Sequence, residues 1–233
     1  MTGMLASVCS EAEARLVHRA GADIIDLKDP GRGALGALDT ELVRRIVDRT
    51  GKGIPFSATI GDIPYRAEHI EPRIRAMAAA GVDYVKVGVF GDAGDSRVLN
   101  LLRHLSGQGI RIVLVLFAED PLPRDFRALG ASGAAGIMLD TRMKTTGTLR
   151  DKLGPECLRA FVGQARAAQL LCGLAGSLGA EDVPALRRLK PDYLGFRGAL
   201  CRGGRRTARL DAGLLRRLRT LLSEHEAGVS ECA

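Results

Sequence analysis

Short apolar segments recur at regular intervals along the whole chain, and this repetition constrains the fold more than any other feature. We count about eight of them, each four to seven residues long and rich in β-branched or aliphatic residues, as buried strands are. The expected strands are 4–8, 23–27, 55–60, 84–90, 111–117, 136–139, 171–175 and 193–196. Segments with helical spacing separate them, at 11–20, 41–49, 70–80, 98–106, 124–129, 157–169, 183–189 and 211–226.

This alternation of strand and helix predicts the α/β class. Strands that are apolar throughout and separated by single helices form parallel sheets with helices on their outer surface. About eight such units in 233 residues fit a single (β/α)₈ TIM barrel, and an open doubly wound sheet is the alternative. We expect the barrel to occupy 1–226 as the catalytic domain and 227–233 to be a flexible C-terminal tail.

Composition narrows the classes of protein further. The chain carries 34 Lys and Arg against 27 Asp and Glu, a net charge of +7. No apolar run approaches the roughly 18 residues that span a bilayer, and residues 1–10 lack the basic and apolar regions of a signal peptide. We therefore expect a cytoplasmic protein that does not bind membranes.

Metal and cofactor motifs are not recognisable in the sequence. The five cysteines are scattered without a CxxC pair, and the four histidines are isolated from one another. The string GRGALG at 31–36 matches a dinucleotide-binding pattern only as letters, because a proline separates it from the preceding strand. We expect no disulfide, no metal and no cofactor.

Charged residues stand at several predicted strand ends, where TIM barrels place their active sites. Asp26 and Lys28 are two residues apart, so in an extended strand they point to the same side. Lys86 lies inside an apolar strand, where a charge is costly without a partner or a function. Asp140 ends the sixth strand and Lys144 follows it. For any one lysine a salt bridge at the barrel rim is an equally good interpretation.

Three of only six lysines thus converge on one end of the predicted barrel. Clustered ammonium groups repel one another, so at least one is expected to lose its proton near neutral pH. A neutral lysine amine is the nucleophile that forms a Schiff base with a carbonyl substrate. Nearby carboxylates would balance the remaining charges and transfer protons.

The last two strands suggest phosphate binding. They end near Gly176 and Ser177, and near Arg197 and Gly198, at the position where barrels commonly bind phosphate. Glycines allow backbone N–H groups to approach an anion, and arginine supplies charge, although plain turns would look the same. In the third strand, Ser57 and Thr59 share one face and would either border the pocket or fill a barrel layer.

Six motifs resemble those of the (5-formylfuran-3-yl)methyl phosphate synthases, enzymes of methanofuran biosynthesis. They occur in the family's order: GADIIDLKDP (21–30), SATIGDIPY (57–65), DYVKVG (83–88), MLDTRMK (138–144), LAGS (174–177) and GFRGALC (195–201). The resemblance implies a TIM-barrel lyase that condenses two molecules of glyceraldehyde 3-phosphate, with loss of one phosphate and two waters. One triose would isomerise to its ketone form, bind a lysine as an imine and attack the aldehyde of the second.

Carried over by position, the resemblance also implies the catalytic residues. Lys28 matches the Schiff-base lysine, and Asp26, Lys86, Asp140 and Lys144 match the other catalytic positions. We expect Lys86 to donate a proton or contact phosphate, and Asp140 with Lys144 to act as the acid/base pair. These last two roles are interchangeable on the sequence alone.

Two other functions fit parts of the sequence. A class I aldolase or a triose-phosphate-type isomerase would use the same barrel and imine lysine, but needs fewer lysines. Binding of RNA would use the arginine-rich segment 187–219, yet aromatic residues make up only 4% of the chain. We expect a small-molecule substrate, glyceraldehyde 3-phosphate, no nucleic acid and a homo-oligomer.

Overall fold

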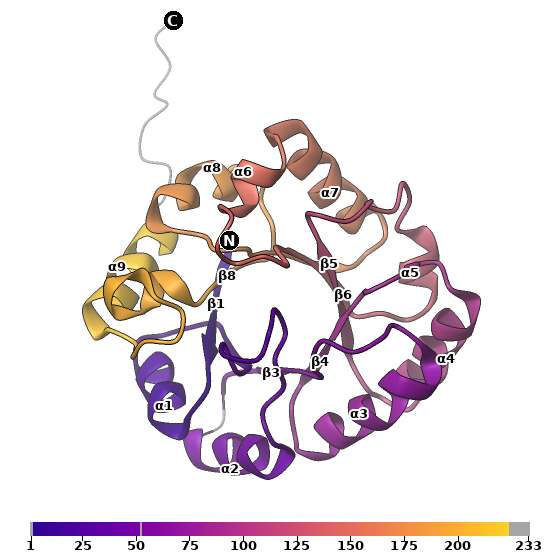
Figure 1. The fold of residues 1–233 in the computed structure, drawn as a ribbon, viewed down its shortest axis with the longest axis horizontal. Helices are drawn as coiled ribbons and strands as arrows, with labels where there is room; N and C mark the ends of the chain where they lie inside the picture. Colours follow the sequence, from indigo (N-terminus) through magenta and orange to yellow (C-terminus); the bar gives the residue numbers. More distant parts are fainter. Residues whose placement is uncertain (1, 52, 224–233) are drawn as a thin grey trace, which may run out of the picture.

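Eight parallel strands form a closed barrel in the computed structural model, which describes residues 2–51 and 53–223 (Figure 1). Neighbouring strands pair in sequence order, and β8 closes the barrel by pairing with β1. The predicted TIM barrel is confirmed, and the open sheet is excluded. The strands are β1 (Gly3–Val8), β2 (Ile24–Leu27), β3 (Phe56–Thr59), β4 (Tyr84–Gly88), β5 (Ile112–Phe117), β6 (Gly136–Asp140), β7 (Leu171–Leu174) and β8 (Tyr193–Phe196).

Helices surround the strands as an outer ring in Figure 1. The longer ones lie where the sequence predicts them, whereas α6 and the three 3₁₀ turns are too short to show a helical period. The expected tail 227–233 lies outside the described residues. The helices are α1 (Glu11–Arg19), α2 (Thr40–Thr50), α3 (Ala67–Ala79), α4 (Ser96–Gly107), α5 (Arg127–Ala131), α6 (Leu149–Lys152), α7 (Pro155–Ala167), α8 (Val183–Arg187) and α9 (Ala212–Ser223), with 3₁₀ turns η1 (Ala180–Asp182), η2 (Gly198–Leu200) and η3 (Arg202–Gly204).

The inside of the barrel is divided into a polar part and an apolar part. Strands β1 to β4 direct Ser7, Asp26, Ser57 and Lys86 inward, where they contact one another. The remaining interior is apolar and is formed by Leu5, Val113, Val115, Phe117, Met138, Ala175 and Tyr193, together with Ala34 and Leu35 of the β2–α2 loop. The polar network beneath the mouth therefore comes from β1 to β4, whereas Asp140, which is also buried, stands at the end of β6.

The β2–α2 loop reaches over the centre of the ring in Figure 1. Asp62, in the loop after β3, accepts hydrogen bonds from the backbone N–H of Ala34 and of Leu35, both at 2.8 Å. Thr59 donates its hydroxyl hydrogen to the carbonyl of Gly36 at 3.0 Å. The loop that follows Lys28 is thus fixed by its neighbouring strand.

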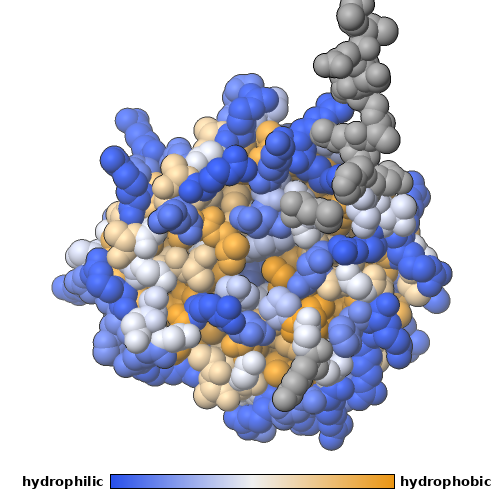
Figure 2. Space-filling model, turned by 180° about the vertical axis from the view of Figure 1, so that it is seen from behind, coloured by the Kyte–Doolittle hydropathy of each residue, from blue (hydrophilic) through white to orange (hydrophobic). Residues whose placement is uncertain are grey.

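Hydrophilic side chains cover the outer rim of the face shown in Figure 2, and apolar residues gather nearer its centre. None of the helices in the described part of the chain is long and apolar enough to cross a membrane. Large apolar side chains at the surface are few among these residues: Met143 and Leu171 are the two recorded as exposed.

Candidate active site

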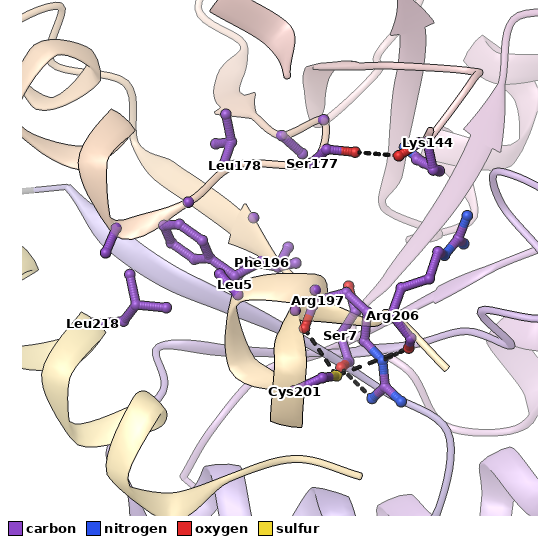
Figure 3. Close-up of a pocket in the computed structure, with 18 of the residues that line it drawn as sticks. Leu5, Ser7, Lys144, Ser177, Leu178, Phe196, Arg197, Cys201, Arg206 and Leu218 are labelled. Carbon is purple, nitrogen blue, oxygen red and sulfur yellow. Dashed lines mark hydrogen bonds between the residues drawn. The ribbon is translucent and has the colours of Figure 1, made fainter. Parts of the chain in front are cut away.

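A cavity of about 700 Å³ lies at the C-terminal ends of the strands, where the sequence places the site. Its polar side chains come from opposite sides of the barrel, and Leu178, Phe196 and Leu218 form an apolar wall (Figure 3). Among the predicted site residues, those that border it are Lys28, Asp140, Lys144, Gly176, Ser177, Arg197 and Gly198. A volume of this size accommodates small phosphorylated metabolites.

Asp26 is the centre of a buried polar network beneath this cavity. Its carboxylate accepts hydrogen bonds from Ser7 at 2.9 Å, from Ser57 at 2.7 Å and from the Lys86 ammonium at 3.0 Å. The Lys28 ammonium lies 3.9 Å from the Asp26 oxygen that accepts the hydrogen bond of Ser7. Burial alone would raise the pKa of Asp26, but the lysine charges and the Ser57 hydrogen bond outweigh it and lower the pKa.

Lys28 combines access to the cavity with an altered pKa. Burial lowers the pKa of Lys28 to about 8, against the opposing attraction of Asp26 and Asp140. Repulsion by Lys86 and Lys144 acts in the same direction as burial but is the smaller effect. Repulsion between lysines, expected from the sequence, is thus present, but desolvation is the larger cause of the lowered pKa. With a pKa of about 8, about a tenth of Lys28 is a neutral amine at pH 7, far more than for an ordinary lysine.

Asp140 and Lys144 form a second pair at the edge of the cavity. Their closest oxygen and nitrogen atoms are 2.5 Å apart, and the same carboxylate oxygen accepts the backbone N–H of Thr141 at 2.7 Å. Burial opposes ionisation, but the charges of Lys144 and Lys28 lower the pKa of Asp140 to about 2. At neutral pH Asp140 is therefore a carboxylate, held against the Lys144 side chain.

The other predicted residues lie deeper in the barrel. Lys86 is 1% exposed and does not border the cavity. Ser57 bonds to Asp26, and Thr59 bonds to Gly36 of the β2–α2 loop, so both hydroxyls contact protein groups beneath the cavity surface. Ser57 and Lys86 therefore hold Asp26 in place, and Thr59 holds the β2–α2 loop.

Gly176 and Ser177 shape the loop after β7. Both have left-handed backbone angles, with φ of +111° and +51°. Ser177 also donates its hydroxyl hydrogen to the carbonyl of Lys144 at 3.1 Å (Figure 3). A side chain on Gly176 would lie 2.7 Å from the Thr141 methyl carbon. Glycine is required here both by conformation and by space.

Replacing Gly176 by alanine is expected to lower the free energy of unfolding by about 2–4 kcal/mol, because strain and steric clash add. Urea unfolding of Gly176→Ala measures this. Gly203→Ala is the matched control, since Gly203 also has a positive φ, +64°, but no atom within 4 Å of its added carbon. Equal losses in the two variants would show that the contact with Thr141 contributes nothing.

Arg197 borders the cavity, but its guanidinium is bound to protein groups. It forms an ion pair with Glu13, with contacts of 2.6 and 3.2 Å, and donates to the carbonyl oxygens of Ser7, Arg206 and Ala208. The Glu13 carboxylate also accepts the backbone N–H of Cys9. Arg197 thus connects β1, α1 and the loop after β8.

Two residues of the site were not singled out from the sequence. Ser7 borders the cavity and bonds to Asp26, and its place at the end of the first strand was an available signal. Arg206 borders the cavity from the β8–α9 loop, where nothing distinguishes it from the neighbouring arginines in the sequence. In the described part of the chain, no group of three His, Cys, Asp or Glu side chains is arranged to hold a metal ion.

Comparison with known sequences bears directly on this site. The profile of the 4-HFC-P synthase family matches residues 4–219, which include all the residues that border the cavity. The chain belongs to the 4-HFC-P synthase family.

Other members of the 4-HFC-P synthase family are similar over nearly their whole length. A protein of Methylorubrum extorquens, provisionally named (5-formylfuran-3-yl)methyl phosphate synthase, is 47% identical over 209 residues, which cover 89% of this chain and 86% of that protein. The (5-formylfuran-3-yl)methyl phosphate synthase of Methanothermobacter thermautotrophicus is 35% identical over 232 residues, covering 94% and 98%. The resemblance predicted from the motifs is confirmed.

Solved structures with a similar fold include other barrels. The phosphoribosyl anthranilate isomerase of Thermus thermophilus superposes with a TM-score of 0.68 at 18% identity, and the 3-hexulose-6-phosphate synthase of Salmonella typhimurium with 0.66 at 19%. Each alignment covers 95% of this chain and 98% of the other. At these identities the similarity supports the fold of this 4-HFC-P synthase family member and not its substrate.

Proposed function

We propose that this protein is a (5-formylfuran-3-yl)methyl phosphate synthase that acts in methanofuran biosynthesis as a carbon–oxygen lyase. Two molecules of glyceraldehyde 3-phosphate yield one furan aldehyde phosphate, one phosphate and two waters, which balances all atoms without an oxidant. The observation that carries the proposal is Lys28, whose pKa is lowered to about 8 and which borders the cavity between two buried carboxylates.

Lys28 is the proposed nucleophile. Its neutral amine adds to the carbonyl carbon of a triose phosphate, and loss of water gives an iminium ion that withdraws electrons from the adjacent carbon. Asp26, 3.9 Å away, stabilises the positive charge that develops on this nitrogen. Asp26 is itself fixed by Ser7, Ser57 and Lys86, so it requires no rearrangement during the reaction.

The pair of Asp140 and Lys144 is the proposed acid/base centre. The Asp140 carboxylate removes a proton from carbon next to the iminium ion, and the Lys144 ammonium gives one to a departing hydroxyl or phosphate oxygen. Their contact of 2.5 Å allows the proton to return from one to the other. Lys86 does not border the cavity, so we assign it the role of holding Asp26 and not of contacting phosphate.

Backbone N–H groups of the loops at Gly176–Ser177 and Gly198 are proposed to bind a substrate phosphate. Both loops border the cavity, and they follow β7 and β8. The carbonyl carbon of a bound triose would then be directed toward Lys28.

The rate of imine formation is expected to increase with pH. The reactive form of Lys28 is the neutral amine, so kcat/KM should rise about tenfold per pH unit below the pKa of about 8 and level off above it. Furan formation measured between about pH 7 and 9.5 tests this, since a phosphate monoester, with its second pKa near 6, stays dianionic there. A profile that is flat through pH 8 would contradict the assignment of Lys28.

Product analysis distinguishes the proposal from the related alternatives. Purified protein is incubated with glyceraldehyde 3-phosphate alone, and the products are separated and identified by their masses in mass spectrometry. An aromatic aldehyde monophosphate supports the synthase. A six-carbon sugar bisphosphate would instead indicate an aldolase, and dihydroxyacetone phosphate as sole product an isomerase.

A further inference from the structure

Arg197 and Arg206 border the same cavity, but their side chains have different partners. Arg197 is 8% exposed, and its guanidinium is neutralised by Glu13 and bonded to three carbonyl oxygens. In Figure 3 the Arg206 guanidinium points toward Lys144, whereas that of Arg197 points the other way. Arg197 therefore has no donor group available for an anion in the cavity.

The Arg206 guanidinium is half-buried and lacks a partner of opposite charge. No carboxylate of the residues that the structure describes lies within ion-pair distance of it, and its recorded hydrogen bond goes to the carbonyl of Gly33, 3.0 Å away. Burial lowers its pKa, although the charge of Asp140 acts in the opposite direction. An arginine in this state has several free donors in a planar arrangement that fits a phosphate.

The charge of the site also favours an added anion. Four cationic groups, Lys28, Lys86, Lys144 and Arg206, are placed around two carboxylates, Asp26 and Asp140. A dianionic phosphate would neutralise the excess. The other charged residues that border the cavity, Glu181, Arg205 and Arg217, are exposed, so water and salt screen their charges more strongly.

We propose that Arg206 is the side chain that recognises the substrate phosphate, and that it links the bound phosphate to the β2–α2 loop through the carbonyl of Gly33. This inference rests on the proposed function in that the ligand is a triose phosphate. Arg197 is then a positioning residue, because it binds the carbonyl oxygens of Arg206 and Ala208 and so fixes the loop that carries Arg206.

Through the carbonyl of Gly33, a phosphate bound to Arg206 would restrain the β2–α2 loop, which follows Lys28. Gly33 lies five positions after Lys28, and the next two residues are held by Asp62 through the backbone N–H of Ala34 and of Leu35. A phosphate bound to Arg206 restrains that side chain, and with it the carbonyl of Gly33. Binding of phosphate is thus expected to protect the β2–α2 loop against opening.

Phosphate affinity tests the inference without requiring turnover. Calorimetric titration with inorganic phosphate should show binding to the wild type, about 30-fold weaker binding to Arg206→Gln and intermediate binding to Arg206→Lys, because a charged hydrogen bond is lost. Arg209→Gln is the matched control, since Arg209 is an exposed arginine of the same loop that does not border the cavity. Unchanged affinity in Arg206→Gln, or no binding to the wild type, would overturn the proposal.

Two further readouts separate recognition from a loss of structure. Phosphate should slow amide hydrogen exchange of the β2–α2 loop in the wild type and in Arg209→Gln but not in Arg206→Gln. Arg206→Gln should also raise KM for glyceraldehyde 3-phosphate about 30-fold with a smaller change in kcat. Loss of kcat without a change in KM would contradict recognition of the ground state. A wild type that binds phosphate through Arg206 but makes no furan would refute the proposed function and leave this inference standing.

Discussion

Replacing Lys28 by alanine is expected to reduce furan formation on the order of 10⁴-fold or more, because the variant lacks the amine that forms the imine at the cavity. The same variant should lose the covalent adduct that borohydride traps between the wild-type protein and glyceraldehyde 3-phosphate. Mass spectrometry of the intact protein measures the adduct, and peptide mapping should assign it to Lys28.

Two control variants are needed. One tests whether the positive charge of Lys28 is sufficient without its amine, and the other tests whether loss of any lysine has the same effect. Lys28→Arg keeps a cation beside Asp26 but has no nucleophilic amine, so it should be as inactive as alanine. Lys190→Gln changes an exposed lysine between α8 and β8, at the other end of the barrel, and should form the adduct normally. An adduct that persists in Lys28→Arg would show that the imine forms on another residue and would refute the mechanism.

Replacing Asp26 by asparagine is expected to lower the free energy of unfolding by about 3–5 kcal/mol, because the ammonium of Lys86 would remain buried without a counter-charge. The two groups are 3.0 Å apart, and their side chains are 0% and 1% exposed. Chemical unfolding at pH 7 measures the loss. Lys28 would also lose its stabilising carboxylate, so activity should fall together with stability.

A double-variant cycle shows whether this loss arises from the pair. Lys86→Met removes the ammonium while retaining most of the side chain's volume. The double variant of Asp26→Asn and Lys86→Met should therefore be more stable than the sum of the two single losses predicts, by about 1–3 kcal/mol. Additive losses would mean that the two groups do not interact in the folded protein.

The sequence was sufficient to predict the barrel and several of the residues that border the cavity at its mouth. Alternation with a period of two places Asp26 and Lys28 on one side of a strand, and the rule that barrel sites form at the carboxyl ends of strands brings Asp140 to the same mouth. Both statements depend only on local geometry and topology. They therefore hold without knowledge of how individual side chains pack.

The partners of the arginines could not be predicted in the same way. Arg197 is bound by Glu13, which lies 184 positions earlier in the chain, and no local pattern indicates this pairing. The sequence consequently points to Arg197 for phosphate, whereas in the structure the half-buried arginine without an ion pair at the cavity is Arg206. The depth of Lys86 was also hidden, because a strand pattern gives the direction of a side chain but not its distance from the solvent.

The central claim is that this barrel converts two triose phosphates into a furan. The most direct test follows ultraviolet absorbance and released inorganic phosphate together, with purified protein and glyceraldehyde 3-phosphate and with no added metal or cofactor. We expect one phosphate for each furan aldehyde with the wild type, and neither signal with Lys28→Ala. Turnover of the substrate without release of phosphate and without a chromophore would contradict it.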